Sequence, residues 1–238
     1  RVLFRSKILA HKYFYGGNIM SLKLVIFDMD GLMYDTEPIG MKCMLEAALQ
    51  YGYEIDKEFA LNSIGMNVKD HRKLVLEKFG PDYPYDKISL QSRKMRMDYL
   101  LENGITVKPG LKELISYLKQ KNILIAIASS SKRETIDTYN KLANLDDSLF
   151  DYIISGDKVE HSKPSPDIYL KVLEHLPINN EEELVLEDSR NGILAASNAK
   201  IKVICVPDLV KHGDDINKLL YKTVLSLNEV IDEVEKLL

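Results

Sequence analysis

The sequence predicts an α/β fold in which a doubly wound parallel sheet carries an inserted all-helical cap. Short apolar runs rich in Ile, Val and Leu alternate with helical patterns along most of the chain. Such runs are typical of parallel strands covered on both faces, and strand–helix alternation builds a doubly wound sheet through right-handed crossovers. One long stretch near the start breaks the alternation, because it contains helical patterns and no good strand.

The first predicted strand is the apolar run from Leu24 to Phe27, and four further runs have the same character. These four are Ile123–Ala128, Tyr152–Ser155, Leu184–Leu186 and Ile201–Val206. Helical periodicity predicts helices that alternate with the strands, at Gly110–Lys119, Lys132–Leu142, Pro166–Leu176 and Asn191–Ala199. Together these segments form the predicted Rossmann-like core.

The break in the alternation lies between Gly31 and Lys108. Helical patterns cover it, approximately at Ile39–Tyr51, Val68–Lys78 and Asp86–Glu102. We therefore expect a helical cap at residues 36–107 and an α/β catalytic core made of residues 20–35 and 108–238. Because the insertion follows the first strand directly, it can fold over the carboxyl end of that strand as a lid.

Residues 1–19 belong to neither of these two units. Arg5, Lys7 and Lys12 interrupt any apolar core that a signal peptide would need. The first strand begins almost directly after Met20, as expected for a native start. We therefore expect residues 1–19 to be a non-native or disordered extension, and the native protein to start at Met20.

The composition limits the class of partner. The chain has 238 residues, a net charge of −4, and ordinary apolar (45%) and charged (29%) fractions. A nucleic-acid binder normally carries a basic patch, so this charge argues against nucleic acid but not against a small anion at a locally positive site. No apolar run is long enough to span a membrane. Cys43 and Cys205 match no metal spacing, which is typical of buried thiols in a reducing compartment. We therefore expect a cytoplasmic protein. Because nothing in the sequence requires an oligomer, we also expect a monomer.

Two carboxylates spaced two residues apart, Asp28 and Asp30, follow the first predicted strand, and Gly31 comes next. Open α/β sheets place their active sites at this end of the strands. Two acids this close repel each other, so a cation is usually needed to keep both ionised. The pair predicts a metal-held nucleophile, Asp28, beside an acid/base, Asp30; the alternative is a strand end with solvated acids.

Three serines, Ser129, Ser130 and Ser131, lie at the end of the second predicted strand, where the chain turns into a helix. Hydroxyls and free backbone N–H groups at such a turn can bind an anion, helped by the positive end of the helix. The alternative is N-capping of that helix by Ser130 or Ser131, with Glu134 completing a capping box. The two interpretations are compatible with each other.

The third and fourth strands are also followed by charged side chains. Lys163 stands next to a proline in the loop after the third strand, where it can reach an anion as a point charge. Glu187 and Asp188 end the fourth strand and could complete a hard oxygen shell for Mg²⁺. The alternatives are a solvated loop lysine and a helix cap by Asp188 or Ser189. Because the carboxyl ends of these four strands converge in a doubly wound sheet, we expect all four sets to form one site.

These residues resemble the four motifs of the haloacid dehalogenase superfamily in order and spacing. The matching motifs are Asp28-Met29-Asp30-Gly31, Ser129, Lys163-Pro164 and Glu187-Asp188. The resemblance covers nearly everything from Met20 onward. The helical insertion after the first motif is similar to that of the subgroup containing β-phosphoglucomutase and phosphoglycolate phosphatase. The dehalogenases lack the second aspartate, so Asp30 indicates phosphoryl transfer.

The resemblance implies a phosphoric monoester hydrolase that acts on a small phosphorylated metabolite through an aspartyl-phosphate. Asp28 would attack the phosphorus, and Asp30 would act first as an acid and then as a base. Mg²⁺ would be held by the Asp28 carboxylate, the Asp30 backbone carbonyl and Asp188. Glu187 would hold a metal-bound water or lie behind these ligands.

The resemblance also implies how the transferred group is held. Ser129 and Lys163, with backbone N–H groups near Ser130, would stabilise the phosphoryl oxygens. Substrate choice is expected to depend on the cap. Three polar cap residues are candidates for substrate contact: Asn67, Lys69 and Arg72.

A phosphosugar mutase of the β-phosphoglucomutase type is the first alternative, because the motifs fit it equally well. That enzyme has a histidine after its first motif and an arginine and a lysine in its cap. The corresponding positions here are Gly40, Val68 and Met95. These losses remove groups that would grip a second phosphate and the sugar, so we favour a phosphatase.

Two further alternatives have less support. Phosphonoacetaldehyde hydrolase uses a cap lysine, but Lys69 lies one residue out of place for that role and Asp30 does not fit that enzyme. A catalytically inactive binding protein of the same fold would be expected to lack Asp28, Asp30, Asp188 or Lys163. All four are present.

Overall fold

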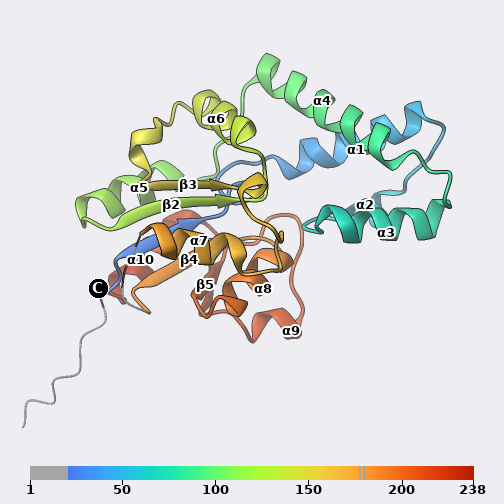
Figure 1. The fold of residues 1–238 in the computed structure, drawn as a ribbon. Coiled ribbons are helices and arrows are strands. Elements are labelled where there is room, and N and C mark those ends of the chain that lie inside the picture. Colours follow the sequence, from blue (N-terminus) through green and yellow to red (C-terminus); the bar gives the residue numbers. More distant parts are fainter. Residues whose placement is uncertain (1–20, 177, 179–180) are drawn as a thin grey trace, which may run out of the picture.

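The structure is a computed structural model that describes residues 21–176, 178 and 181–238 (Figure 1). The expected extension at 1–19 and the expected start at Met20 lie outside the described residues. The core is a six-stranded parallel sheet with the strand order β3-β2-β1-β4-β5-β6. The predicted doubly wound α/β fold is therefore confirmed. Within the described part of the chain, no helix is both long and apolar enough to cross a membrane.

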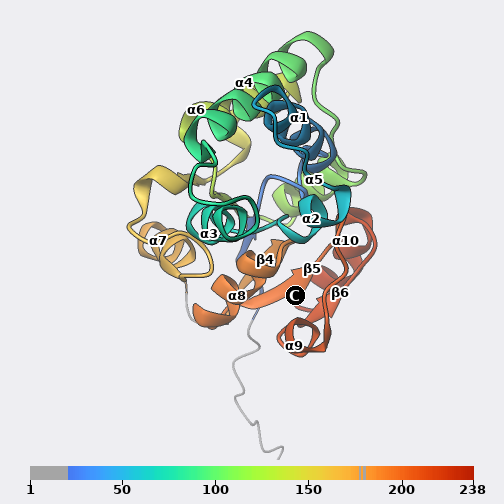
Figure 2. The ribbon, with the colours of Figure 1, turned by 90° about the vertical axis from the view of Figure 1, so that its right-hand side faces the viewer.

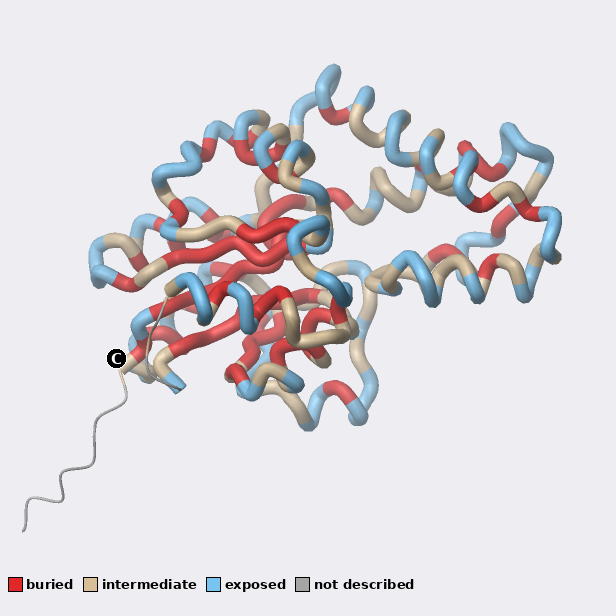
Figure 3. The backbone as a smooth tube through the Cα atoms, in the orientation of Figure 1, coloured by how far each residue is buried: buried red, intermediate tan, exposed pale blue. Residues whose placement is uncertain are grey.

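All five predicted strands are present, each shifted by two residues or fewer at its ends. The strands are β1 (Leu24–Phe27), β2 (Leu124–Ser129), β3 (Tyr152–Ser155), β4 (Glu183–Glu187), β5 (Lys202–Cys205) and β6 (Lys222–Thr223). The central three, β2, β1 and β4, are almost entirely buried, as Figure 3 shows in red. The short edge strand β6 was not predicted, because its two exposed residues carry no apolar pattern.

Helices cover both faces of the sheet. In the core they are α5 (Leu111–Gln120), α6 (Arg133–Leu142), α7 (Asp167–His175), α8 (Arg190–Asn198), α9 (Asp214–Asn217) and α10 (Leu227–Glu235). Two short 3₁₀ turns, η1 (Asp147–Leu149) and η2 (Gly156–Lys158), complete the connections. Figure 2 shows α5 and α10 on one side of the sheet and α7 and α8 on the other.

Alternate residues of β1 enter two separate apolar cores. Val25 and Phe27 pack with residues of α5, α6 and α10 on one face, whereas Leu24 and Ile26 pack with residues of α7 and α8 on the other. Side chains of successive strand residues point to opposite faces, so a fully apolar strand is what a two-sided core requires. This packing fixes β1 in the centre of the sheet.

Of the five helices between β1 and β2, the first four lie to one side of the sheet (Figure 1). They are α1 (Glu37–Gln50), α2 (Lys57–Asn62), α3 (Val68–Phe79) and α4 (Tyr85–Asn103). They enclose an apolar cluster of their own, which includes Ala47, Val75 and Ile88. This arrangement supports the proposed division into a cap at 36–107 and a core at 20–35 and 108–238.

The two chain segments that connect these helices to the sheet run side by side. Asp35 N donates to Thr106 O over 2.9 Å, and Lys108 N donates to Met33 O over 2.9 Å. An isolated antiparallel bridge joins Tyr34 to Val107 between these two hydrogen bonds. The helical insertion is therefore attached at one place, beside the carboxyl end of β1.

Candidate active site

The strand register brings the predicted residues to one edge of the sheet. Phe27 pairs with Ile127 on β2 and with Leu186 on β4, so the residues that follow these strands lie next to one another. They line a cavity of about 700 Å³ between the sheet and the helical insertion. Its lining includes Asp28, Asp30, Ser129, Ser130, Lys163 and Asp188 from the core and Asn67, Lys69 and Arg72 from the insertion.

Lys163 lies at the centre of the site with its side chain 5% exposed. Its Nζ donates to Asp28 Oδ1 over 2.5 Å, to Glu187 Oε1 over 2.7 Å and to the carbonyl oxygen of Ala128 over 3.1 Å. Burial alone would lower the pKa of Lys163, but the negative charges of Asp28 and Glu187 raise it by more than burial lowers it. The pKa therefore lies well above its ordinary value. The alternative of a solvated loop lysine is therefore wrong.

Glu187 is fully buried, and both of its carboxylate oxygens are occupied by protein donors. Oε1 accepts from Lys163 and, over 2.9 Å, from the hydroxyl of Tyr169. Oε2 accepts from the backbone N–H groups of Asp188 and Ser189 and from the Ser189 hydroxyl, each over 3.0 Å. A Cβ on Gly192 would lie 1.6 Å from Oε1, so the glycine leaves the space that Glu187 fills. Glu187 thus anchors Lys163 to the start of α8.

Asp188 has an unsatisfied oxygen that faces the other carboxylates. Its Oδ1 is buried and has no hydrogen-bond partner among the described residues. Gly31, at φ +84°, allows Asp188 to come close, because a Cβ there would lie 2.3 Å from Asp188 Oδ2. Ser189 caps α8 by accepting from Gly192 N, so the predicted cap by Ser189 is confirmed and Asp188 is free for another role.

Three carboxylates gather at this point. Asp28, Glu187 and Asp188 each offer one oxygen within 4.8 Å of the others, so the cluster could hold a metal ion. Burial, followed by the Coulomb repulsion of Glu187, raises the pKa of Asp28 to about 8, although Lys163 opposes the shift. Burial and the neighbouring acids also raise the pKa of Asp188 well above its ordinary value. One lysine does not offset three buried carboxylates, so a further cation would favour their ionised forms.

Asp30 is held by two hydroxyl groups from different elements. Its Oδ1 accepts from Thr36 Oγ1 over 2.7 Å, and its Oδ2 accepts from Ser131 Oγ over 2.8 Å. The helix α6 has Lys132 at its N-cap without a side-chain cap bond, so the capping alternative for Ser130 and Ser131 is wrong. The hydroxyl of Ser131 orients Asp30 instead.

Ser129 and Ser130 differ in their surroundings. Ser129 is 1% exposed, and its Oγ accepts from Ser131 N over 3.1 Å. This leaves the Ser129 hydroxyl proton without an acceptor among the residues described. Ser130 is exposed at the mouth of the same cavity. The β2–α6 turn therefore presents one buried hydroxyl donor to the cavity.

The three predicted cap residues line the cavity but have different partners. Asn67 caps α3 by accepting from Asp70 N over 2.9 Å. Arg72 forms an ion pair with Asp86 and lies 4.5 Å from the ring centroid of Tyr85. Lys69 is exposed and has no hydrogen bond or ion pair with any described residue.

Sequence reasoning did not identify several residues that shape the site. Thr36 holds Asp30, Tyr169 holds Glu187, and Arg96 and Glu37 line the same cavity. Ser131 was a candidate for anion binding or helix capping, but its role in holding Asp30 was not predicted. No local signal marks Arg96 or Tyr169, because Arg96 is one of several charged residues along α4 and Tyr169 is one polar residue on the amphipathic helix α7. Thr36 lies in the segment just after the first motif, and its position there was the one available hint.

The fold and the site together define a doubly wound α/β protein with an aspartate–lysine centre at its strand ends and a helical insertion above it. A family model described as Haloacid dehalogenase-like hydrolase matches residues 25–206. The chain therefore belongs to the haloacid dehalogenase-like hydrolases, and the resemblance seen in the motifs is confirmed.

Known proteins of this family are similar over most of their length. A phosphorylated carbohydrates phosphatase of Thermotoga maritima is 32% identical, with 77% of this chain and 84% of that protein covered. Hexitol phosphatase B of Escherichia coli is 29% identical, with 86% of this chain and 92% of that protein covered. The crystal structure of CbbY from Rhodobacter sphaeroides in complex with phosphate is 25% identical in sequence and has a TM-score of 0.74. The match covers 88% of this chain and 96% of the CbbY chain.

Proposed function

We propose that this protein is a Mg²⁺-dependent phosphatase that hydrolyses a small phosphorylated metabolite through an aspartyl-phosphate. The observation that carries the proposal is the buried bridge from Asp28 through Lys163 to Glu187. A carboxylate can attack a phosphoryl group, which is itself anionic, only where fixed positive charge offsets the repulsion. The phosphatases among the similar proteins, from Thermotoga maritima and Escherichia coli, support the same reaction.

The donor set fits Mg²⁺. Mg²⁺ prefers oxygen ligands, and the Asp28 and Asp188 carboxylates with the Asp30 backbone carbonyl would provide them. The partnerless, buried Oδ1 of Asp188 supports this assignment, because such an atom is costly unless it binds a cation or a donor. Both oxygens of Glu187 already accept hydrogen bonds, so Glu187 is better placed to orient the metal ligands than to bind the metal itself. When bound, Mg²⁺ supplies positive charge next to the attacking carboxylate.

In the first half of the reaction, an oxygen of Asp28 attacks the substrate phosphorus in line with the ester oxygen. The bond between phosphorus and the ester oxygen breaks, and Asp30 gives its proton to the leaving oxygen. In the second half, Asp30 takes a proton from water as the water attacks the same phosphorus. The Asp28–phosphorus bond then breaks and inorganic phosphate is released.

The transferred phosphoryl group needs donors on its equatorial oxygens. The Ser129 hydroxyl, the ammonium group of Lys163 and the backbone N–H of Ser130 are our candidates, since they line the cavity at the end of β2. Thr36 and Ser131 keep the carboxylate of Asp30 in a fixed orientation. The chemistry is thus mostly positioning and charge stabilisation, as expected for phosphoryl transfer.

Hydrolysis is favoured over phosphosugar isomerisation. The positions at which a β-phosphoglucomutase-type enzyme would carry its histidine, arginine and lysine are Gly40, Val68 and Met95. None of these three side chains is cationic, so none can take the place of the groups that such an enzyme uses. The free, buried thiols of Cys43 and Cys205 support our further proposal that the protein works in the reducing cytoplasm.

The variant Asp28→Asn tests the proposal. An amide cannot attack phosphorus, so we expect Mg²⁺-dependent phosphate release from p-nitrophenyl phosphate to fall by at least about 1000-fold. Circular dichroism should show an unchanged fold, and Asp98→Asn on the exposed face of α4 should keep full activity. Wild-type activity in Asp28→Asn would refute the assignment. Formation of glucose 6-phosphate from β-glucose 1-phosphate would instead favour the mutase.

A further inference from the structure

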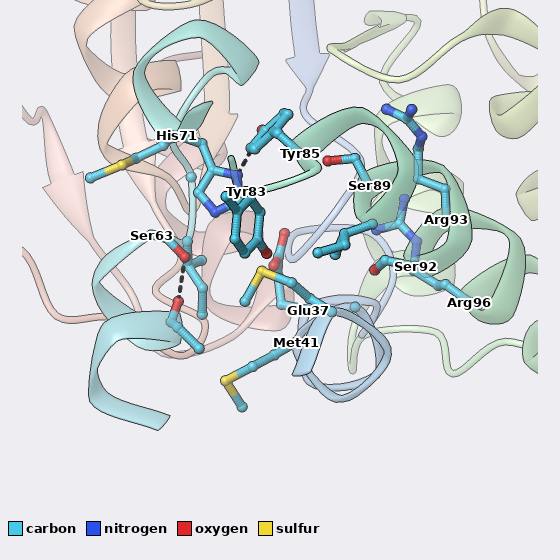
Figure 4. Close-up of a pocket in the computed structure, with 17 residues that line it drawn as sticks. Glu37, Met41, Ser63, His71, Tyr83, Tyr85, Ser89, Ser92, Arg93 and Arg96 are labelled. Carbon is cyan, nitrogen blue, oxygen red and sulfur yellow. Dashed lines mark hydrogen bonds between the residues drawn. The ribbon is translucent and has the colours of Figure 1, made fainter. Parts of the chain in front are cut away.

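A second cavity, of about 260 Å³, lies within the cap helices (Figure 4). It borders the catalytic cavity, because both are lined by Glu37, Arg96 and the loop residues 64–66. Figure 4 shows side chains of α1, α3 and α4 directed toward this space. A molecule whose phosphate lies at Asp28 could therefore extend its remaining atoms past Arg96 into the cap.

Arg96 is a partly buried cation without a protein partner. Its guanidinium forms no hydrogen bond or ion pair within the described part of the chain. Burial lowers its pKa, but Asp30, Tyr139 and Glu37 raise it, so the group stays charged. A guanidinium has five N–H donors in a rigid fork that matches carboxylate and phosphate oxygens, and leaving them unpaired in a partly desolvated site is costly.

Gly40 makes the space that Arg96 occupies. A Cβ on this glycine would lie 3.4 Å from Arg96 Nη1 and 3.7 Å from Arg96 Cδ, so the side chain of Arg96 packs on the bare backbone of α1. A Cβ alone would make ordinary van der Waals contact with Arg96, whereas a side chain that extends further would compete with the guanidinium for this space. The lack of a side chain at this position is thus linked to the presence of a cation between the two cavities.

Cationic and neutral polar side chains line much of the cap cavity. Ser89, Ser92 and Arg93 line it, and His71 contributes an Nε2 atom that is buried and has no partner among the described residues. Among the described residues that line this cavity, Glu37 is the only carboxylate. Burial, with the repulsion of Asp30, raises the pKa of Glu37 to about 7, so its charge is only partly present at neutral pH. Such a lining favours negative charge on the ligand.

We propose that Arg96 binds an anionic oxygen group, a carboxylate or a second phosphate, on the leaving group of the substrate. The inference rests on the proposed phosphatase function and narrows its substrate class to small phosphomonoesters that carry a second anionic group. Arg96 is then the residue that selects the substrate, whereas Lys163 and Ser129 hold the group that is transferred.

Two matched substrate pairs test this selection with purified, Mg²⁺-loaded protein. The first pair is 3-phosphoglycerate and glycerol 3-phosphate, and the second is fructose 1,6-bisphosphate and fructose 6-phosphate. In Arg96→Ala we expect kcat/KM to fall about 10- to 100-fold for the anionic member of at least one pair, mainly through KM. The first pair reports a carboxylate and the second a phosphate. Activity on glycerol 3-phosphate and fructose 6-phosphate, which lack the second anionic group, and on p-nitrophenyl phosphate should change less than about threefold.

Three more variants separate recognition from folding. Gly40→Leu keeps Arg96 but fills its space, so the same selective loss is expected. Arg96→Lys keeps the charge without the fork and should restore part of the lost activity. Lys94→Ala removes an exposed cation from the same helix and should leave every substrate unaffected.

The outcomes are distinct. An equal loss on all substrates, or no loss in Arg96→Ala, overturns the inference and leaves the phosphatase proposal intact. Absence of turnover in the wild type, even with p-nitrophenyl phosphate, refutes the phosphatase proposal. In that event, calorimetric binding of 3-phosphoglycerate and of fructose 1,6-bisphosphate still decides: weaker binding of either by Arg96→Ala supports the role of Arg96, and equal binding of both overturns it.

Discussion

Gly31 permits the close approach of Asp188 to the end of β1, and it does so with φ +84°, which disfavours any side chain. We expect Gly31→Ala to push Asp188 away and to cost about 1–2 kcal/mol of stability. The variant should also need a higher Mg²⁺ concentration to reach half of its maximal kcat. The measurements are urea unfolding and a Mg²⁺ titration of kcat. Gly104→Ala is the matched control, because Gly104 has φ +80° with nothing within 4 Å of its added Cβ. A similar Mg²⁺ titration for both variants would contradict the role of Gly31.

Glu37 gives a prediction about pH. Its folded pKa of about 7 lies above its ordinary value of 4.5, because burial disfavours the charged form. Between these values the unfolded chain is ionised while the folded chain holds a proton, so stability is lost as the pH rises from about 4.5 to 7. We expect Glu37→Gln to exceed the wild type in unfolding free energy by about 1–2 kcal/mol at pH 8 and to equal it at pH 4.5. Glu46→Gln, exposed on the same helix, should show no such difference; a constant offset for Glu37→Gln would disprove the mechanism.

Residues that follow predicted strands could be located from the sequence, whereas their helical partners could not. Asp28, Ser129 and Asp188 come directly after or at the ends of apolar runs, so the parallel sheet alone brings them together. Tyr169 and Arg96 reach the site from helices, and their direction depends on how those helices pack. A hydroxyl 2.9 Å from Glu187 cannot be read from a helical pattern.

At the scale of elements, a hydrogen bond joins α8 of the core to the loop between α2 and α3 of the insertion. Asn191 Nδ2, on α8, donates to the carbonyl oxygen of Gly65 over 2.6 Å, and Gly65 belongs to the loop between α2 and α3. Asn191→Ala should loosen this loop over the cavity, raise KM about 3- to 10-fold, and speed amide hydrogen exchange at residues 63–67. Asn103→Ala, which removes a comparable bond to Tyr99 O at the end of α4, is the control. Unchanged exchange in Asn191→Ala would show that other contacts hold the loop.

Elements with a clear apolar pattern were mostly predictable, whereas the shortest helices were not. The strand β3 (Tyr152–Ser155) was placed to the residue, and α3 began where expected, at Val68. The helices α2 and α9 span six and four residues, which is too short for a 3.6-residue period to appear. The helix α10 was also missed, although Leu227, Val230 and Val234 form a regular apolar face.

At the scale of the whole molecule, the excess of buried acid over base predicts that a bound cation increases the stability of the fold. Asp28, Glu187 and Asp188 face one lysine, so a bound divalent ion should stabilise the folded state selectively. At a hundred times its Kd, Mg²⁺ should add about 2.7 kcal/mol, or about 5–10 °C in Tm. Thermal unfolding with Mg²⁺ and with EDTA measures this gain. Asp188→Asn should abolish it and Asp98→Asn should retain it; equal gains in both variants would exclude Asp188 as a ligand.

The paired segments at 33–36 and 105–108 leave and re-enter the core as neighbours, joined by backbone hydrogen bonds. The ends of the insertion are therefore as close together as the ends of a tight loop. A different helical module, or a simple turn, could be joined at the same two points without moving β1 or β2. On the proposed function, the part that selects the substrate could thus be exchanged, by evolution or by protein engineering, without rebuilding the part that breaks the ester.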